Sequence, residues 1–366
     1  MNTRLNSAAE QLKHRFIDFA LLNSKSNVFY LSGFDCEPHE RLLALFLFPD
    51  AEPFLVCPEL DRERARVSGW DRDIVAYGDA DDPWKKIRAA LKERGIKNPE
   101  RIAVEKEQLS YARAEALKKI FPSTRLVSAE ENVQPIRMVK NADEVQTLTE
   151  AARLADFGVE AGLRALKTGC TEMEVIARIE YELKQKGVRE MSFSTMVLFG
   201  EKSGQPHGVP GERKLKEGDF VLFDLGVIYN GYCSDITRTF VYRSVTEEQI
   251  RIYETVLQSQ TAVLERCHPG TPISELDRTA RGIIDGAGYG EYFPHRIGHG
   301  LGIEAHEFPS LHEKNEDLLR EGMVFTVEPG IYIPELGGVR IEDDLVITAD
   351  GHRTLTRFPK ELQVVS

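Results

Sequence analysis

The chain of 366 residues is 42% hydrophobic and 29% charged, a composition typical of a globular protein with room for two domains and substantial cores. Its formal net charge of −12 argues against nucleic acid or an anionic membrane as a partner, because phosphate binding needs clustered cations. The longest apolar run, residues 42–48, is too short to span a bilayer. The polar N-terminus lacks the apolar centre of a signal peptide, so we expect residence in the cytoplasm.

The first 135 residues alternate between helical and strand patterns. We expect a helix over residues 7–16, strands over 17–22, 42–48 and 54–56, and helices over 83–94 and 109–121. This alternation predicts an α/β domain over residues 1–135 that carries no catalytic cluster of its own.

One dense polar loop precedes the buried strand at residues 42–48. It contains Asp35, Glu37, His39, Glu40 and Arg41. The simpler interpretation is a solvated connection. A role in recognising the ends of a substrate stays open.

The domain boundary is predicted near Pro135, and residues 136–366 would form the second domain. A long amphipathic helix is expected over residues 137–166, with Asn141 or Asp143 capping its first turn. Further helices are expected over residues 171–186, 246–266 and 272–287, and their apolar stripes indicate packing against a core.

The cysteines do not indicate a disulfide framework. They are five in number and widely spaced, with no C-x-x-C pair: Cys36, Cys57, Cys170, Cys233 and Cys267. We therefore expect reduced, buried thiols, and packing as the role of Cys233 even though it lies close to Asp235 in the sequence.

Two acidic residues flank a predicted hairpin. The Asn-Gly dipeptide at residues 230–231 favours a two-residue turn, because both turn positions take positive φ. Pairing about this turn places Asp224 opposite Thr237 and Gly226 opposite Asp235, with all four on one sheet face. A bridging dication would remove the repulsion between the two acids, and Gly226 would leave space for it. The alternative is a pair of acids on a solvent-facing hairpin.

Glu328 and Glu342 repeat this arrangement around the turn-prone residues 334–338, and His299 lies between the two hairpins in the sequence. Four carboxylates with one imidazole describe a site for one or two divalent cations of the manganese, cobalt or zinc kind. The predicted ligands are Asp224, Asp235, His299, Glu328 and Glu342.

Four sequence segments around these residues are distinctive: VLFDLGVIYNGYCSDITRTF, HRIGHGLGIEAHE, FTVEPGIY and GGVRIEDD. Together they resemble the metal-dependent pita-bread (M24) peptidases, and within them the Xaa-Pro dipeptidase (prolidase) and aminopeptidase P branch. The resemblance runs from about Val139 to the C-terminus. It implies an α/β (α+β) protein: a pita-bread domain with a curved antiparallel sheet and outer helices, after a smaller N-terminal domain of creatinase/prolidase type.

The resemblance also implies two divalent ions per subunit, with Mn²⁺ expected and Co²⁺, Zn²⁺ or Fe²⁺ as alternatives. Asp235 and Glu342 would bridge the two ions. Asp224 would complete the first site, and His299 with Glu328 would complete the second.

Further residues would serve the reaction. Glu328 is expected to pass a proton to the leaving nitrogen, His295 and His306 to stabilise negative charge on the carbonyl oxygen, and His207 to orient the substrate. Arg340 is expected either to bind a carboxylate or to hold a bridging ligand, and both roles stay open. The Thr237 hydroxyl is expected to face a bridging acid.

The expected activity is hydrolysis of the peptide bond before proline in Xaa-Pro dipeptides, by a homodimer. The resemblance also implies that the polar loop from Asp35 to Arg41 could contact substrate bound in a neighbouring subunit. The alternative is an aminopeptidase P that releases the first residue of longer Xaa-Pro peptides. Creatinase shares the architecture but works without metal, and the full set of ligands argues against it. A non-catalytic pita-bread scaffold that binds other proteins is disfavoured for the same reason.

Overall fold

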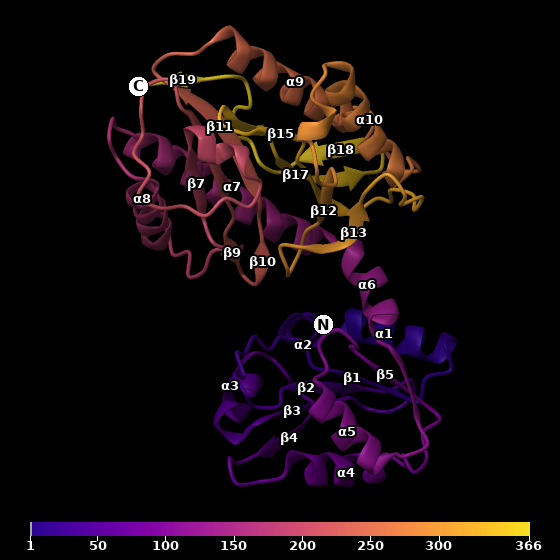
Figure 1. Ribbon diagram of the computed structural model, residues 1–366. Helices are drawn as coiled ribbons and strands as arrows, with labels where there is room; N and C mark the ends of the chain where they lie inside the picture. The colour runs from indigo at the N-terminus through magenta and orange to yellow at the C-terminus, as the bar shows by residue number, and fades with distance from the viewer. Residues whose placement is uncertain (1) are drawn as a thin grey trace. The chain divides into compact units, whose positions relative to one another are not determined.

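The structure is a computed structural model that describes residues 2–366. The chain divides into two compact units, the first ending at Arg137 and the second spanning Met138–Ser366. Figure 1 shows the N-terminal unit from indigo to magenta and the C-terminal unit from magenta to yellow. The sequence places the boundary after residue 135, two residues earlier.

The N-terminal unit is built on a six-stranded sheet with the order β4-β3-β2-β1-β5-β6. Its strands are β1 (Phe19–Leu22), β2 (Ala44–Leu47), β3 (Phe54–Pro58), β4 (Asp73–Tyr77), β5 (Arg101–Val104) and β6 (Arg125–Ser128). β2 pairs antiparallel with β1 and β3, whereas the other pairs are parallel. The three strands expected from their apolar runs, β1 to β3, are buried along their whole length.

Six α-helices belong to this part of the chain. They are α1 (Asn2–His14), α2 (Lys25–Ser32), α3 (Arg62–Val67), α4 (Pro83–Glu93), α5 (Tyr111–Ile120) and α6 (Glu130–Met138). The helix expected over residues 7–16 is α1, but it ends earlier because Phe16 takes a left-handed conformation with φ of 52°. α4 and α5 lie where the sequence predicts them, whereas α2, α3 and β4 to β6 are not predicted.

Four helices belong to the C-terminal unit: α7 (Ala142–Ala165), α8 (Glu172–Gln185), α9 (Glu247–Leu264) and α10 (Ile273–Gly286). The start of the helix expected over residues 137–166 is wrong. α6 extends to Met138, and α7 begins as a separate helix at Ala142. Asn141, and not Asp143, is the cap. Its side chain accepts a hydrogen bond from the Glu144 N–H, and the Glu144 carboxylate accepts one from the Asn141 N–H.

The strands of the C-terminal unit form two larger sheets, with the orders β19-β11-β8-β7 and β13-β12-β14-β17-β18, and two small ones, β10-β9 and β15-β16. They are β7 (Met196–Phe199), β8 (Phe220–Leu225), β9 (Ile228–Tyr229), β10 (Tyr232–Cys233), β11 (Ile236–Tyr242), β12 (Gly298–Gly300), β13 (Glu307–Leu311), β14 (Val324–Val327), β15 (Gly330–Ile333), β16 (Gly337–Arg340), β17 (Asp343–Thr348), β18 (Gly351–Thr354) and β19 (Val364–Val365). The two larger sheets meet at an antiparallel bridge between Thr237 and Glu342. The expected curved sheet is thus two linked sheets, and β19 runs parallel to β11.

Each larger sheet has its own pair of helices. α7 and α8 pack on β7, β8 and β11 in one apolar core, and α9 and α10 pack with β14 and β17 in another. α7 comes close to β8 because Gly162 has no side chain: a Cβ there would lie 2.7 Å from the Phe223 ring. Asp224 directly follows Phe223 on β8, so the packing of Phe223 in this core fixes the backbone next to Asp224.

None of the helices between residues 2 and 366 combines the length and the apolar character needed to cross a bilayer. All five cysteines are free and buried. Cys233 packs, with its thiol donating to the Ile303 carbonyl.

Candidate metal centre and active-site cleft

A cleft of about 550 Å³ in the C-terminal unit brings together every residue that the sequence assigns to the site. Its lining includes the five predicted metal ligands together with His207, His295, His306 and Arg340. The remaining lining residues are Phe193, Met196, Pro206, Arg296, Glu304 and Ala305. Acids, imidazoles and guanidinium groups therefore converge in one hollow that also has apolar walls.

The predicted hairpin holds the first two acids. Asn230 and Gly231 form the turn with φ of 48° and 81°, and Asp224 on β8 pairs with Thr237 on β11 as expected. The expectation for Gly226 is wrong. A Cβ there would lie 1.9 Å from the main-chain oxygen of Ser234, so this glycine allows two backbones to approach closely and leaves no space for an ion.

The second acidic pair lies at strand ends. Glu328 directly follows β14, and Glu342 lies between β16 and β17. The Thr237 hydroxyl donates to Oε2 of Glu342 at 2.7 Å, as the sequence predicts. The hairpins on which these acids lie are adjacent because the two larger sheets meet at this point.

His299 is placed by β12 and is only 3% exposed. Its Nδ1 lies 3.2 Å from the Gly300 carbonyl, which can only accept a hydrogen bond, so Nδ1 carries the proton. The unprotonated Nε2 then faces Glu328 at 3.3 Å and Asp235 at 3.9 Å. Burial, followed by the neighbouring His306, lowers the pKa of His299 to about 3, and the neutral form that binds metals is favoured.

The acids in the cleft repel one another. Burial raises the pKa of Asp235 and of Glu342 well above the ordinary values, with further contributions from neighbouring carboxylates. Burial also raises the pKa of Glu328 to about 7, and Asp224 adds to this while Arg340 opposes it. A dication among these groups would offset the repulsion.

Two observations fit the site to cations. Oδ1 of Asp224 and Oδ1 of Asp235 are buried without any hydrogen-bond partner, a costly state unless an ion binds them. Donor atoms of Asp235, His299 and Glu342 lie within 4.8 Å of one another, as ligands of one ion would. Carboxylate oxygens with one imidazole suit Mn²⁺, Co²⁺, Zn²⁺ or Fe²⁺.

Arg340 is bonded to three protein groups. Its guanidinium donates to Oδ2 of Asp224, to the Thr237 hydroxyl at 3.0 Å and to the Tyr332 hydroxyl at 3.0 Å. It is only 4% exposed. Two roles were left open for Arg340, binding a carboxylate or holding a bridging ligand. These contacts favour a role in holding metal ligands, but the ligand that Arg340 contacts directly is Asp224 and not a bridging acid.

Tyr332 links Arg340 to His295. His295 donates from Nδ1 to its neighbouring carbonyl, that of Arg296, at 2.8 Å, so its Nε2 accepts the hydrogen bond from the Tyr332 hydroxyl at 2.8 Å. Burial lowers the pKa of His295 to about 4. Both ring nitrogens of this neutral histidine are therefore occupied by protein groups.

Several supporting residues are not found from the sequence. Thr326 lies between two ligands, accepting from the His299 N–H at 3.2 Å and donating to Glu328 at 3.4 Å. Asp344 accepts from the Asp235 N–H at 2.9 Å. Tyr332 and Arg296 complete this group. Threonine and tyrosine are common in strands, so no local signal distinguishes these residues before the fold is known.

The polar loop before β2 belongs to the N-terminal unit. There Asp35 lies 3.4 Å from Lys25, and Arg41 lies 2.9 Å from Asp79. These pairs agree with the simpler interpretation as a solvated connection. The role in a neighbouring subunit stays a prediction.

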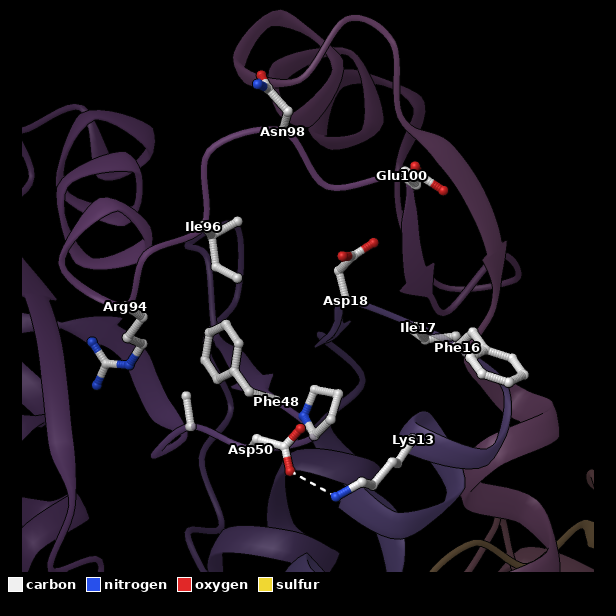
Figure 2. A pocket seen from close by; sticks show the side chains of 12 residues that line it. Lys13, Phe16, Ile17, Asp18, Phe48, Asp50, Arg94, Ile96, Asn98 and Glu100 are labelled. Carbon is white, nitrogen blue, oxygen red and sulfur yellow. Dashed lines mark hydrogen bonds and ion pairs between the residues drawn. The ribbon is translucent and has the colours of Figure 1, made fainter.

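A second hollow, of about 710 Å³, lies on the N-terminal unit. Figure 2 shows Lys13 paired with Asp50, Phe48 between this pair and Ile96, and Phe16 beside Ile17. Arg94 pairs with Asp73 at 2.6 Å. The cationic side chains of this hollow are thus already paired.

Comparison with known families identifies the class of protein. Residues 146–349 match metallopeptidase family M24, and residues 4–139 match the creatinase/prolidase N-terminal domain. The chain belongs to metallopeptidase family M24 and is a peptidase of the architecture expected from the sequence, a creatinase-like domain followed by a pita-bread domain.

Individual relatives are similar along the whole chain. The protein named "Putative dipeptidase YkvY" of Bacillus subtilis (strain 168) is 56% identical over 362 residues, which cover 99% of both chains. The solved Xaa-Pro dipeptidase of Bacillus anthracis is 32% identical with a TM-score of 0.92, covering 100% of this chain and 99% of that one. The X-Pro aminopeptidase of Thermotoga maritima is 28% identical with a TM-score of 0.87, covering 97% of this chain and 100% of that one.

Proposed function

We propose that this peptidase uses two divalent ions to hydrolyse the peptide bond before proline, with Xaa-Pro dipeptides as its substrates. The observation that carries the proposal is the convergence of four carboxylates and His299 in one cleft, with two buried carboxylate oxygens that lack partners. Two similar solved structures are of a prolidase and an Xaa-Pro dipeptidase, which supports a substrate with proline after the scissile bond.

The proposed ligand roles follow the sequence prediction. Asp235 and Glu342 would bridge two ions, Asp224 would complete one site, and His299 with Glu328 would complete the other. Divalent ions, when bound, polarise the scissile carbonyl and lower the pKa of the attacking water. Mn²⁺ is the proposed metal, with Co²⁺, Zn²⁺ and Fe²⁺ as alternatives.

Glu328 would handle the proton. Its carboxyl would accept a proton from water and release it to the leaving proline nitrogen. Thr326 donates to Oε1 of Glu328, so Oε2 is the oxygen left for proton transfer.

The histidines would divide the remaining work. His295 is engaged at both nitrogens and would act by holding Tyr332, which revises its expected role at the carbonyl oxygen. His306, whose ring lies 4.1 Å from that of His299, is exposed. It would donate to the negative charge that develops on the carbonyl oxygen. His207, also exposed, would orient the substrate.

Metal dependence is tested first. Chelator-treated protein should release no amino acid from an Xaa-Pro dipeptide, and Mn²⁺ should restore release. The Asp235→Asn variant should lose both bound metal and activity, whereas Asp317→Asn, a change at an exposed acid, should keep both. An Asp235→Asn protein that is active without metal would overturn the assignment.

Product analysis tests the substrate. The metal-loaded protein is incubated side by side with an Xaa-Pro dipeptide and an Xaa-Pro-Xaa tripeptide. Cleavage of the dipeptide alone supports the proposal, and release of the first residue from the tripeptide points instead to an aminopeptidase P. Cleavage of neither peptide rejects proline specificity. The homodimer and the cytoplasmic location stay predictions.

A further inference from the structure

The segment that carries His207 forms part of the wall of the cleft. It follows β7 and consists of a short 3-10 helix, η2 (Gly200–Gly204), and an irregular stretch up to residue 211. We call residues 200–211 the His207 loop. Pro206 and His207 line the cleft from this loop, and the His207 side chain is exposed. The place where His207 meets a substrate therefore depends on how the loop is held.

The middle of the His207 loop has no hydrogen bond to the rest of the protein. Within residues 2–366, residues 205–210 form hydrogen bonds only with one another and with Lys202, which belongs to the same loop. The first residue after His207 that is bonded outside the loop is Gly211. The two ends of the loop therefore determine where its middle lies.

One carboxylate bonds both ends of this loop. Oε1 of Glu172 accepts from the Phe199 N–H at 3.0 Å, and Oε2 accepts from the Gly211 N–H at 2.7 Å. The Lys202 ammonium also donates to Oε2. Phe199 directly precedes the loop and Gly211 is its last residue. Glu172 thus ties the two ends to each other and to α8.

Glu172 is completely buried, with 0% of its surface exposed. Burying a carboxylate is costly unless hydrogen-bond donors and a cation compensate for the lost water. Lys202 provides the cation, and the two main-chain N–H groups provide the donors. Glu172 also lies directly after Thr171, the cap of α8, where the helix dipole favours an acid. The loop and the acid therefore stabilise each other.

We propose that Glu172 is a positioning residue of the peptidase, which holds the His207 loop so that His207 meets the substrate in one fixed place. The inference rests on the proposed function, because it takes His207 as a group that orients the substrate. Glu172 is not among the residues that line the cleft. It acts through the loop and touches neither the substrate nor the metal ligands.

Steady-state kinetics of metal-loaded Glu172→Gln with an Xaa-Pro dipeptide is the first test. Glutamine keeps the shape of the side chain but has one acceptor oxygen in place of two, so one main-chain N–H at the ends of the loop loses its acceptor. KM should rise by about 3- to 10-fold, because the substrate must then order the His207 side chain on binding. The affinity for Mn²⁺ and kcat should stay unchanged.

A double-mutant cycle with His207→Ala asks whether Glu172 acts through His207. His207→Ala alone should raise KM. In the His207→Ala protein, the further change Glu172→Gln should leave KM as it is, because the group that the loop positions is already gone. A purely structural role would give the same change in KM with or without His207. If Glu172→Gln does not fold, Lys202→Met takes its place in the cycle, since it removes one bond to the carboxylate and keeps the other two.

Asp156→Asn is the matched control. Asp156 on α7 also holds a main-chain segment, accepting from the Arg357 and Phe358 N–H groups at 2.9 Å, but that segment does not line the cleft. This variant should keep the wild-type KM. Amide hydrogen exchange gives a readout without turnover: Glu172→Gln should speed exchange in the His207 loop and not in β8 or β11, and Asp156→Asn should leave exchange in the loop unchanged.

The outcomes separate the two proposals. If Glu172→Gln keeps the wild-type KM, or raises KM equally with and without His207, the positioning role is wrong while the proposed function stands. Unchanged exchange in the His207 loop of Glu172→Gln would also overturn the positioning role. If metal-loaded wild type cleaves no Xaa-Pro peptide, the proposed function is wrong, and the substrate role of Glu172 is wrong with it.

Discussion

Thr237 and Glu342 are joined by two hydrogen bonds although 105 residues separate them in the chain. The Thr237 hydroxyl donates to Oε2 of Glu342 at 2.7 Å, and the Glu342 N–H donates to the Thr237 carbonyl at 3.1 Å. This contact connects the two larger sheets at the point where their acidic residues meet. It fixes both the backbone and the carboxylate of Glu342, a proposed bridging ligand. The metal centre therefore depends on the contact between the two sheets.

Replacing Thr237 with valine tests whether this contact supports metal binding. Valine keeps the shape but cannot donate to Glu342 or accept from Arg340. We expect metal affinity to fall by about 10- to 100-fold, as when groups that orient metal ligands are lost. Titration of chelator-treated protein with Mn²⁺ measures the change.

The matched control is Thr255→Val in α9, where the hydroxyl donates to the Arg251 carbonyl of the same helix. This variant should bind metal like the wild type. Equal affinity in Thr237→Val and wild type would show that the Thr237 hydroxyl does not orient Glu342.

The features predicted well from the sequence are those set by local chemistry. The Asn-Gly turn at residues 230–231 fixes a register, and that register alone places Asp224 opposite Thr237. Asn141, one of the two caps that the sequence offers for α7, likewise bonds a residue only three positions along the chain. Such signals survive folding because tertiary contacts do not change the φ preference of a turn or the reach of a capping side chain.

The features missed depend on contacts between distant segments. Tyr332 contacts His295, 37 residues away, and Arg296 contacts Ser310 on a paired strand. A tyrosine in an apolar strand and an arginine beside a histidine have many ordinary explanations, so neither stands out. α6, which continues through Pro135, is likewise not predicted, because an internal proline usually ends a helix.

Tyr332→Phe should slow the reaction without affecting metal binding. The hydroxyl accepts from Arg340 and donates to His295, and its removal leaves two buried polar groups without their partner. A loss of about 10- to 100-fold in kcat/KM is expected from the cost of such unpaired groups. Steady-state kinetics with an Xaa-Pro dipeptide and metal analysis of the same sample measure both quantities.

A parallel exchange, Tyr242→Phe, removes a buried hydroxyl that bonds Thr168 away from the cleft lining. It should leave kcat/KM unchanged. If Tyr332→Phe loses metal together with activity, the tyrosine supports the ligands themselves and not the arrangement of His295 and Arg340.

Stability without metal should fall as the pH rises. Burial raises the pKa of Glu328 to about 7 and those of Asp235 and Glu342 well above ordinary values. The folded chain therefore holds protons that the unfolded chain releases at about pH 4. Their contribution to stability is complete below that pH and is lost as the pH rises through about 7 and beyond.

Metal should reverse this trend, because a bound dication displaces the same protons. The rise in melting temperature on adding Mn²⁺ should be larger at about pH 8 than at about pH 5.5. Thermal melts with chelator and with Mn²⁺ across this range check it. A metal-induced shift that is constant or shrinks with rising pH would contradict the prediction.

Asp343, which follows the ligand Glu342 in the chain, should be a structural acid with the opposite pH dependence. It is buried and accepts from Arg238 at 2.6 Å, Lys360 at 2.7 Å and Gln260 at 2.7 Å. Burial alone would raise the pKa of Asp343, but Arg238 and Lys360 lower it below its ordinary value. Its contribution to stability is therefore present above the unfolded value of about 4 and lost as the pH falls below that value.

Asp343→Asn should lower the free energy of unfolding by about 3–5 kcal/mol at pH 7, because it leaves buried Arg238 without its countercharge. The difference from wild type should shrink below about pH 4, where the Asp343 carboxylate of the unfolded wild-type chain takes up a proton and the unfolded state is favoured. Denaturant unfolding of metal-loaded protein at several pH values measures both effects, with Asp317→Asn at an exposed site as the control. A difference that stays constant down to low pH would mean that Asp343 acts through packing and not through its charge.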